Sequence, residues 1–176
     1  PLTDVKMWRD YHIKFVYDKG FMRGTSETIF SPDSTITKGM FVTVLGRMAK
    51  INEAEHQGSS FEDVKESDYF FPYISWAVGN GIIKENAEKN FFPDDAITRE
   101  EALVMLARYA DAQKLSYPTT TNASQPRFTD TDGTSQEFKE TLPLLHAASV
   151  FPPLEDNDIF NPAGALTRQE AAVIFE

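Results

Sequence analysis

Cysteine is absent from the 176 residues, and no apolar run approaches the length needed to cross a membrane. Without cysteine, neither a disulfide framework nor a thiolate metal site can form. No segment has the form of a secretory signal peptide, so any export signal is expected outside this sequence. We therefore predict a chain that does not insert into a membrane. Because the first repeat pattern begins by residue 2 and the last stops within a helix, we expect an excerpt, or the ordered part, of a longer protein.

Positive charge is also scarce, with 17 Lys and Arg against 27 Asp and Glu and a net charge of −10. Nonspecific nucleic-acid binding depends on neutralising phosphates, so no nucleic-acid partner is expected. The 3 histidines stand in unrelated contexts without metal-ligand spacing, and nothing resembles a nucleophile elbow or a phosphate loop. We predict that the chain is not an enzyme and has no catalytic residue, metal or cofactor.

One pattern occurs three times along the chain: aromatic-x-Pro, a short polar loop, aliphatic-Thr-basic, and then an apolar segment with helical spacing. The three copies begin at Phe30, Phe91 and Phe160. The prolines of the pattern are Pro32, Pro93 and Pro162, and its threonines are Thr37, Thr98 and Thr167. Both sets are separated by 61 and then 69 residues, which composition alone does not produce. The chain is predicted to be a three-repeat protein.

Each repeat is predicted to be a helix, a polar loop and a second helix, which makes the fold mainly α. The first helix of each repeat follows an aspartate, which we expect to act as its N-cap. These aspartates are Asp4, Asp63 and Asp130. Gly20 and Gly81 end the first helices of repeats one and two, as glycines commonly do.

The predicted repeats span residues 1–50, 61–115 and 128–176, and the last of them is expected to stop within its second helix. Their linkers are residues 51–60 and a Thr-, Ser- and Pro-rich segment, 116–127. A two-helix unit of this size cannot bury its apolar stripe alone. The three repeats are therefore expected to pack on one another as a pseudo-threefold bundle.

Together, Asp-Val near an aromatic, Gly-Ile, Phe-x-Pro and Ile-Thr-Arg-x-Glu resemble the S-layer homology domain, over nearly the whole chain. The resemblance implies a three-pronged helical assembly that holds a bacterial surface protein on the cell wall without a covalent bond. It implies an extracellular location and, as partner, an anionic secondary cell-wall polysaccharide, typically pyruvylated. The family's ligand grooves lie between neighbouring repeats and use a Thr-Arg-Ala-Glu motif, a tryptophan of the first helix and a loop glycine.

The family's ligand-binding positions are only partly kept in this chain, and no repeat has the complete set. The Thr, Arg and Glu of the motif are found at Thr98, Arg99 and Glu101, and at Thr167, Arg168 and Glu170. Repeat one keeps a basic residue, Lys38, and has Met40 in place of the glutamate. The tryptophan and loop glycine are represented by Trp8, Tyr69 and Gly24.

Helix capping accounts for the threonine and glutamate of the motif, because together they form a capping box. The basic residue between them is less easily explained, since a cation at the first turn of a helix opposes the macrodipole. It is interpreted either as a ligand contact, with the helix N-terminus favouring a bound anion, or as a salt bridge to an acidic residue of a neighbouring repeat.

Three further residues have two interpretations each. Trp8 is either a platform for a sugar ring or part of the core. Arg23 and Lys84 either line a groove or are solvated loop charges. The alternative to polysaccharide anchoring is a protein-interaction or self-assembly module that contacts other surface-layer subunits through degenerate polymer sites.

Overall fold

The computed structural model describes residues 2–5, 10–58, 61–116, 128–148, 150 and 159–176. It contains the helices α1 (Asp10–Asp18), α2 (Lys38–Met48), α3 (Phe71–Gly79), α4 (Arg99–Ala112), α5 (Gln136–Ala147) and α6 (Arg168–Ile174), and a short 3-10 helix, η1 (Glu53–Glu55). β-Sheet pairing within these ranges is limited to isolated bridges. The predicted mainly α fold with two helices in each repeat is confirmed, and none of the described helices is long and apolar enough to span a membrane.

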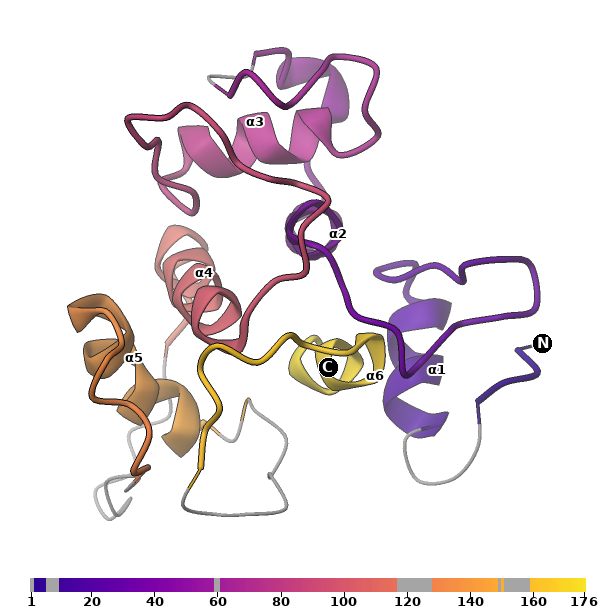
Figure 1. Ribbon diagram of the computed structural model, residues 1–176. Coiled ribbons are helices and arrows are strands. Elements are labelled where there is room, and N and C mark those ends of the chain that lie inside the picture. Colours follow the sequence, from indigo (N-terminus) through magenta and orange to yellow (C-terminus); the bar gives the residue numbers. More distant parts are fainter. Residues whose placement is uncertain (1, 6–9, 59–60, 117–127, 149, 151–158) are drawn as a thin grey trace.

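The second helix of each repeat packs against the first helix of another repeat. Helix α2 contacts α3, α4 contacts α5, and α6 closes the cycle by contacting α1. In Figure 1, α2, α4 and α6 lie toward the middle, while α1, α3 and α5 lie farther out. Each repeat therefore completes its core with a helix from a neighbour, as the size of the single repeat predicts. The boundaries assigned to the repeats stay a prediction.

Three buried aliphatic residues join the repeats through a closed cycle of backbone hydrogen bonds. The Ile36 amide donates to Leu166 at 2.9 Å, the Leu166 amide to Ile97 at 3.1 Å, and the Ile97 amide to Ile36 at 3.0 Å. All three side chains are fully buried. The cycle links the loops that precede α2, α4 and α6. A pseudo-threefold axis through it stays a prediction.

The first amides of the second helices are occupied by carbonyls of neighbouring repeats. Those of Lys38 and Gly39 donate to Asp95 and Pro93 at 2.9 and 2.8 Å. Equivalent bonds join α4 to Gly164 and Pro162, and α6 to Ser34 and Pro32. These amides are not available to an anion, so the expected contribution of the helix N-terminus to a ligand site is wrong.

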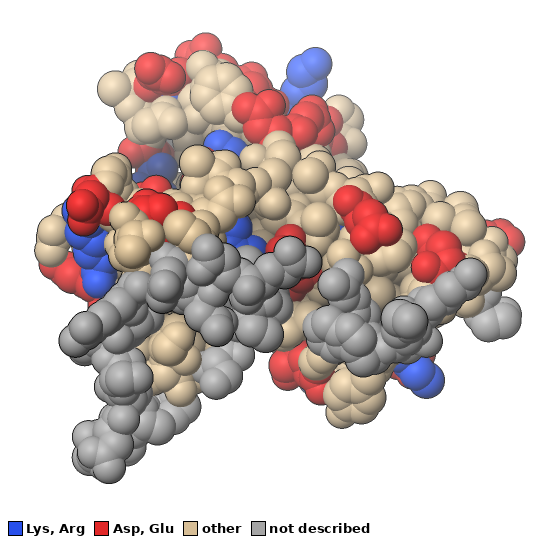
Figure 2. Space-filling model, turned by 60° about the horizontal axis from the view of Figure 1, so that its bottom comes forward, with Lys and Arg blue, Asp and Glu red and all other residues tan. Residues whose placement is uncertain are grey.

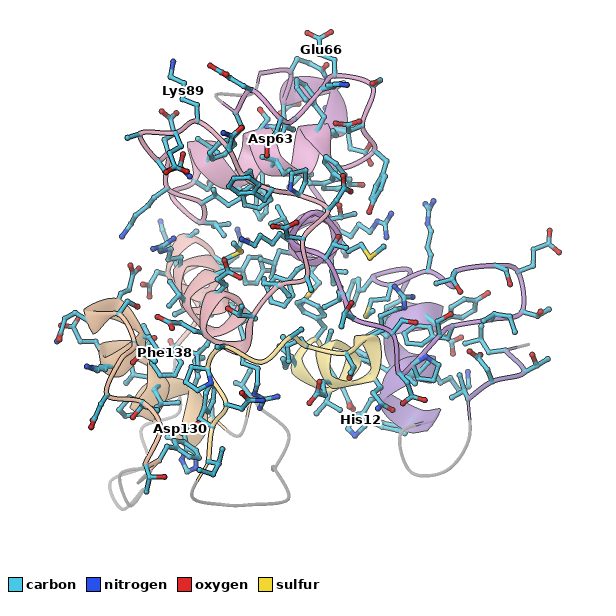
Figure 3. The ribbon with its side chains drawn as sticks, viewed as in Figure 1. His12, Asp63, Glu66, Lys89, Asp130 and Phe138 are labelled. Atoms are coloured by element: carbon cyan, nitrogen blue, oxygen red, sulfur yellow. The ribbon has the colours of Figure 1, made fainter. Side chains whose placement is uncertain are left out.

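The aspartates that open the repeats have another role than the one predicted from sequence. Both carboxylate oxygens of Asp63 accept backbone hydrogen bonds from Phe91 and Phe92, and Asp4 and Asp130 bind the equivalent amides (Figure 3). The N-caps of α3 and α5 are instead Phe70 and Ser135. The N-cap prediction is therefore wrong for Asp63 and Asp130.

The middle residue of each Phe-x-Pro segment explains why the chain needs these carboxylates. Ser31, Phe92 and Asn161 have φ angles of 59°, 56° and 57°, a region that side-chain-bearing residues rarely adopt. Each aspartate binds the amide of this residue and the one before it, and so fixes the loop that leads into the second helix.

Two glycines of α2 let α3 approach closely. A Cβ at Gly39 would lie 2.8 Å from the Phe70 ring, and one at Gly46 would lie 2.4 Å from the Tyr73 ring. Any larger residue would push α3 away. The close packing places Tyr73, and with it the start of α3, beside the loop of the first repeat. Gly20 and Gly81 have φ angles of 72° and 70°, which confirms the predicted ends of the first helices.

Candidate functional site

The basic residue at the start of each second helix reaches into a neighbouring repeat. The buried guanidinium of Arg99 donates from Nε to the Phe160 carbonyl at 2.9 Å and from Nη1 to the Glu170 carboxylate at 3.1 Å. The Nζ atom of Lys38 lies 2.7 Å from the Glu101 carboxylate. For these two cations, the interpretation as salt bridges between repeats is confirmed.

Arg168 differs from the other two because its carboxylate partner is missing. The position that Glu101 and Glu170 occupy in repeats two and three is Met40 in repeat one. Arg168 donates from Nε to the Phe30 carbonyl at 2.8 Å and from Nη2 to the Arg23 carbonyl at 2.6 Å. No described carboxylate forms an ion pair with it. Burial lowers the pKa of Arg168, as expected for a guanidinium withdrawn from water.

Arg168 lies in a cavity of about 480 Å³ between repeats one and two, which we call the first groove. Its walls come from the loop of repeat one, from α2 and from the start of α3, with the Arg168 side chain contributed by α6. The other lining residues used below are Arg23, Gly24, Met40, Arg47, Glu53, Tyr69 and Tyr73. The structure thus brings together the predicted residues Gly24, Tyr69 and Arg168.

Positive charge exceeds negative charge in the first groove. Three guanidinium groups line it, those of Arg23, Arg47 and Arg168, against the single carboxylate of Glu53. That carboxylate accepts a 2.5 Å hydrogen bond from the Tyr73 hydroxyl. Over the face turned forward in Figure 2, acidic side chains are spread out, consistent with the net charge of −10. The first groove is therefore a local basic site in an acidic protein, which is the condition for holding an anion.

Arg47 is fixed in the groove by two contacts. Its Nη1 atom donates to the Phe21 carbonyl at 3.2 Å, and its guanidinium carbon lies 5.9 Å from the centre of the Tyr73 ring. A guanidinium held in this way loses little freedom when it binds a carboxylate through its remaining donors. Arg23 lines this cavity, which confirms one of its two interpretations, and it is also an exposed loop residue, as the other interpretation has it.

Gly24 and Tyr69 contribute in different ways. A Cβ at Gly24 would lie 2.4 Å from the Ser26 carbonyl oxygen and 2.6 Å from that of Ile29, so the loop itself requires glycine. Tyr69 is 55% exposed and packs edge-on against Phe70, which leaves most of its ring free to contact a ligand. Trp8, the other predicted aromatic, lies outside the described residues.

Capping explains the remaining predicted residues. Thr98 with Glu101 and Thr167 with Glu170 form complete capping boxes at α4 and α6, as the sequence pattern indicates. Thr37 caps α2 by accepting a hydrogen bond from the Met40 amide. The structural interpretation of these threonines and glutamates is confirmed, and any part they have in ligand binding stays a prediction.

A second cavity of about 310 Å³, which we call the second groove, lies beside α4 in the equivalent position. It is also lined by three cations, Lys38, Lys84 and Arg108. Each of them forms an ion pair: Lys38 with Glu101, and Lys84 and Arg108 with Glu137 of α5. Lys84 lines this groove, as one of its two interpretations has it, although its side chain is 65% exposed. The second groove has the same construction as the first, but all three of its cations are paired, two of them with the same carboxylate.

Sequence reasoning missed four residues of these grooves: Arg47, Tyr73, Arg108 and Glu137. The two arginines were detectable, because they occupy equivalent positions, 61 residues apart, in the second helices of aligned repeats. Tyr73 and Glu137 were harder to find. Their contribution depends on which face of the first helix turns toward the preceding repeat, and this is fixed only by packing.

The fold and the first groove define a class, namely helical repeat modules that offer a basic groove between repeats. The S-layer homology domain model matches residues 1–39 and 60–103, and the chain belongs to this family. The matched segments include the first helices of repeats one and two and both of their loops. They therefore contain most of the side chains that form the two grooves.

Relatives extend the match to nearly the whole chain. The chain is 30% identical over 173 residues to an exoglucanase, XynX, from Acetivibrio thermocellus, covering 98% of this chain and 16% of that protein. It is 28% identical over 166 residues to the surface-layer 125 kDa protein of Lysinibacillus sphaericus, covering 93% and 13%. It is 29% identical over 105 residues to the cellulosome-anchoring protein of A. thermocellus, covering 57% and 23%. The chain spans less than a quarter of each, and they place it among modules of bacterial cell-surface proteins.

Proposed function

We propose that this chain anchors a bacterial surface protein to the cell wall by binding an anionic secondary cell-wall polysaccharide in the first groove. The observation that carries the proposal is the excess of guanidinium groups there, with Met40 in place of the carboxylate that neutralises the equivalent cation in the other repeats. The names of two relatives, a surface-layer protein and a cellulosome-anchoring protein, support attachment at the cell surface.

A pyruvyl ketal on a sugar fits the chemistry of the first groove. It presents one carboxylate on a compact ring with an apolar methyl group. Arg47 and Arg168 offer planar donors to the carboxylate, and the half-exposed Tyr69 ring offers an apolar face to the sugar. We therefore propose pyruvylated polysaccharide as the ligand and assign Arg168, Arg47, Arg23 and Tyr69 to its recognition.

Retention on cell-wall sacculi tests the anchoring function. The chain is incubated with intact sacculi and with sacculi from which the secondary polymer has been removed. We expect retention on the intact material and loss on the stripped material. Equal retention on both would contradict polymer binding and would favour the protein-interaction module, with other surface-layer subunits as partners.

Removal of one charge tests the assignment to the first groove. Arg47→Gln is expected to weaken retention about tenfold, because a charged hydrogen bond to the ligand carboxylate is lost. Lys139→Gln removes the same charge from the exposed face of α5, outside the groove, and serves as the control. If both variants bind equally well, long-range charge rather than the groove determines binding, and the assignment is wrong.

A further inference from the structure

The second groove is built like the first at each of its basic positions. The Nη1 atom of Arg108 donates to the Ile82 carbonyl at 3.2 Å, just as Arg47 donates to Phe21 at 3.2 Å. Lys84 takes the place of Arg23 and Lys38 that of Arg168. A cavity with three cations in equivalent places has the hydrogen-bond donors to bind an anion, even if these cations form internal ion pairs in the unliganded protein.

Two of these cations are paired with a carboxylate from the chain itself. Glu137 accepts hydrogen bonds from Nε and Nη2 of Arg108, both at 2.6 Å, and from Nζ of Lys84 at 3.1 Å. This is the two-pronged geometry with which an arginine binds a carboxylate ligand. The equivalent position in repeat two is Tyr69, which carries no charge and leaves Arg47 and Arg23 without an ion pair among the described residues.

Glu137 can leave this position without disturbing the fold. It lies in the first turn of α5, its side chain is 35% exposed, and the capping of α5 depends on Ser135. The buried face of α5 is formed by Phe138, Leu142 and Leu145. The Glu137 side chain can therefore swing into water while the helix stays packed. The ion pair lowers the pKa of Glu137 to about 2, so the carboxylate is charged throughout the neutral and mildly acidic range.

We propose that the second groove is a latent binding site for a sugar carboxylate, held closed by Glu137 acting as an internal ligand. The identity of the ligand rests on the function proposed above. A tethered carboxylate competes at an effective concentration in the millimolar range, so a free ligand enters this groove only when it is more concentrated. As the ligand concentration rises, the first groove binds ligand before the second. The second groove adds another point of attachment where the polysaccharide is concentrated.

Substitution of Glu137 tests this proposal. Glu137→Gln removes the charge, and Glu137→Tyr introduces the residue type that repeat two has at this position. Titration calorimetry with a methyl hexopyranoside carrying a 4,6-pyruvyl ketal measures the number of sites. We expect the stoichiometry of both variants to exceed that of the unmodified chain by about one ligand per chain. Glu140→Gln, on an exposed position of the same helix, is the matched control and keeps the original stoichiometry.

The NMR signal of the Arg108 side-chain Nε–H group shows where the added site lies. It is expected to shift during the titration of Glu137→Gln and to stay in place in the unmodified chain below millimolar ligand. If the unmodified chain binds and folded Glu137→Gln or Glu137→Tyr gains no site, the latent site is overturned and the proposed function stands. If only the Glu137 variants bind, the first groove is wrongly assigned and the latent site stands. If none binds, both proposals fail.

Discussion

The first and second grooves use equivalent positions of consecutive repeats and differ mainly in two carboxylates. Met40 and Tyr69 in the first groove correspond to Glu101 and Glu137 around the second. Those glutamates pair with all three cations that line the second groove, whereas the cations of the first groove have no such partners among the described residues. Repeats with one backbone design thus differ in the pairing of their cations through two side chains.

The largest effect is expected from giving the first groove the carboxylate of the second. Met40→Glu places an acid beside Arg168 and completes a capping box with Thr37. We expect the affinity for a pyruvylated hexoside to fall about tenfold or more, because the ligand must displace an internal ion pair. The melting temperature is expected to stay the same or rise.

Met40→Gln separates charge from shape in that experiment. Glutamine keeps the size of the side chain and its ability to cap the helix but adds no charge. Binding by Met40→Gln should therefore remain close to that of the unmodified chain. Equal losses in Met40→Glu and Met40→Gln would show that the methionine contributes by packing against the ligand, and the electrostatic explanation of the difference between grooves would be wrong.

A smaller effect is expected from the aromatic ring of the first groove. Tyr69→Ala should weaken binding of the hexoside roughly threefold to tenfold, because stacking on an aromatic ring contributes about 1 kcal/mol. Tyr11→Ala, on α1, is the control, since that tyrosine is 65% exposed and does not line the groove. Calorimetry measures both affinities. A loss of the same size in Tyr11→Ala would place ligand contacts on α1 and contradict the assignment.

The smallest expected effect concerns pH and the second groove. The ion pair with Arg108 lowers the pKa of Glu137 from 4.5 to about 2. A depressed pKa stabilises the folded state above the unfolded pKa, and this contribution is lost as the pH falls from about 4.5 to about 2. The melting temperature of the unmodified chain should therefore fall more steeply over this range than that of Glu137→Gln. Solvent screening of the partly exposed pair limits the difference to about 2–4 °C.

Thermal unfolding monitored by circular dichroism between pH 5 and pH 2.5 measures the difference. Glu140→Gln should follow the unmodified chain, because its carboxylate has no arginine partner in the described structure. Parallel curves for the unmodified chain and Glu137→Gln would mean that the Arg108 pair does not persist in solution. Arg108 would then have no fixed carboxylate partner, like Arg47 in the first groove.

The repeat pattern was sufficient to predict the helices, the capping boxes of α4 and α6 and the mainly α class. Periodicity and capping are local properties, so Thr98 with Glu101 could be recognised from their spacing alone. The aspartates were misread because spacing suggests a nearby helix, whereas Asp63 binds amides 28 and 29 residues away. Contacts at that separation depend on how the loop folds back, and one sequence does not reveal this.

The candidate site was predicted only in part for the same reason. The motif indicates a cation at Lys38, Arg99 and Arg168, and all three positions do connect repeats. Which of these cations is left without an ion pair depends on whether another repeat places a glutamate beside it. The absence of a glutamate at Met40 was visible in the sequence, but its consequence falls on Arg168, 128 residues later. Only the cyclic packing of the helices joins the two.

That cyclic packing has a consequence for the order in which the chain folds. The bond between the Ile36 amide and the Leu166 carbonyl joins residues 130 positions apart. Closing so long a loop is entropically costly and slow compared with forming a local helix pair. During synthesis from the N-terminus, the first repeat must wait for the last before the ring can close. We therefore expect the emerging chain to expose the apolar surface that this final step buries until nearly all of it has left the ribosome.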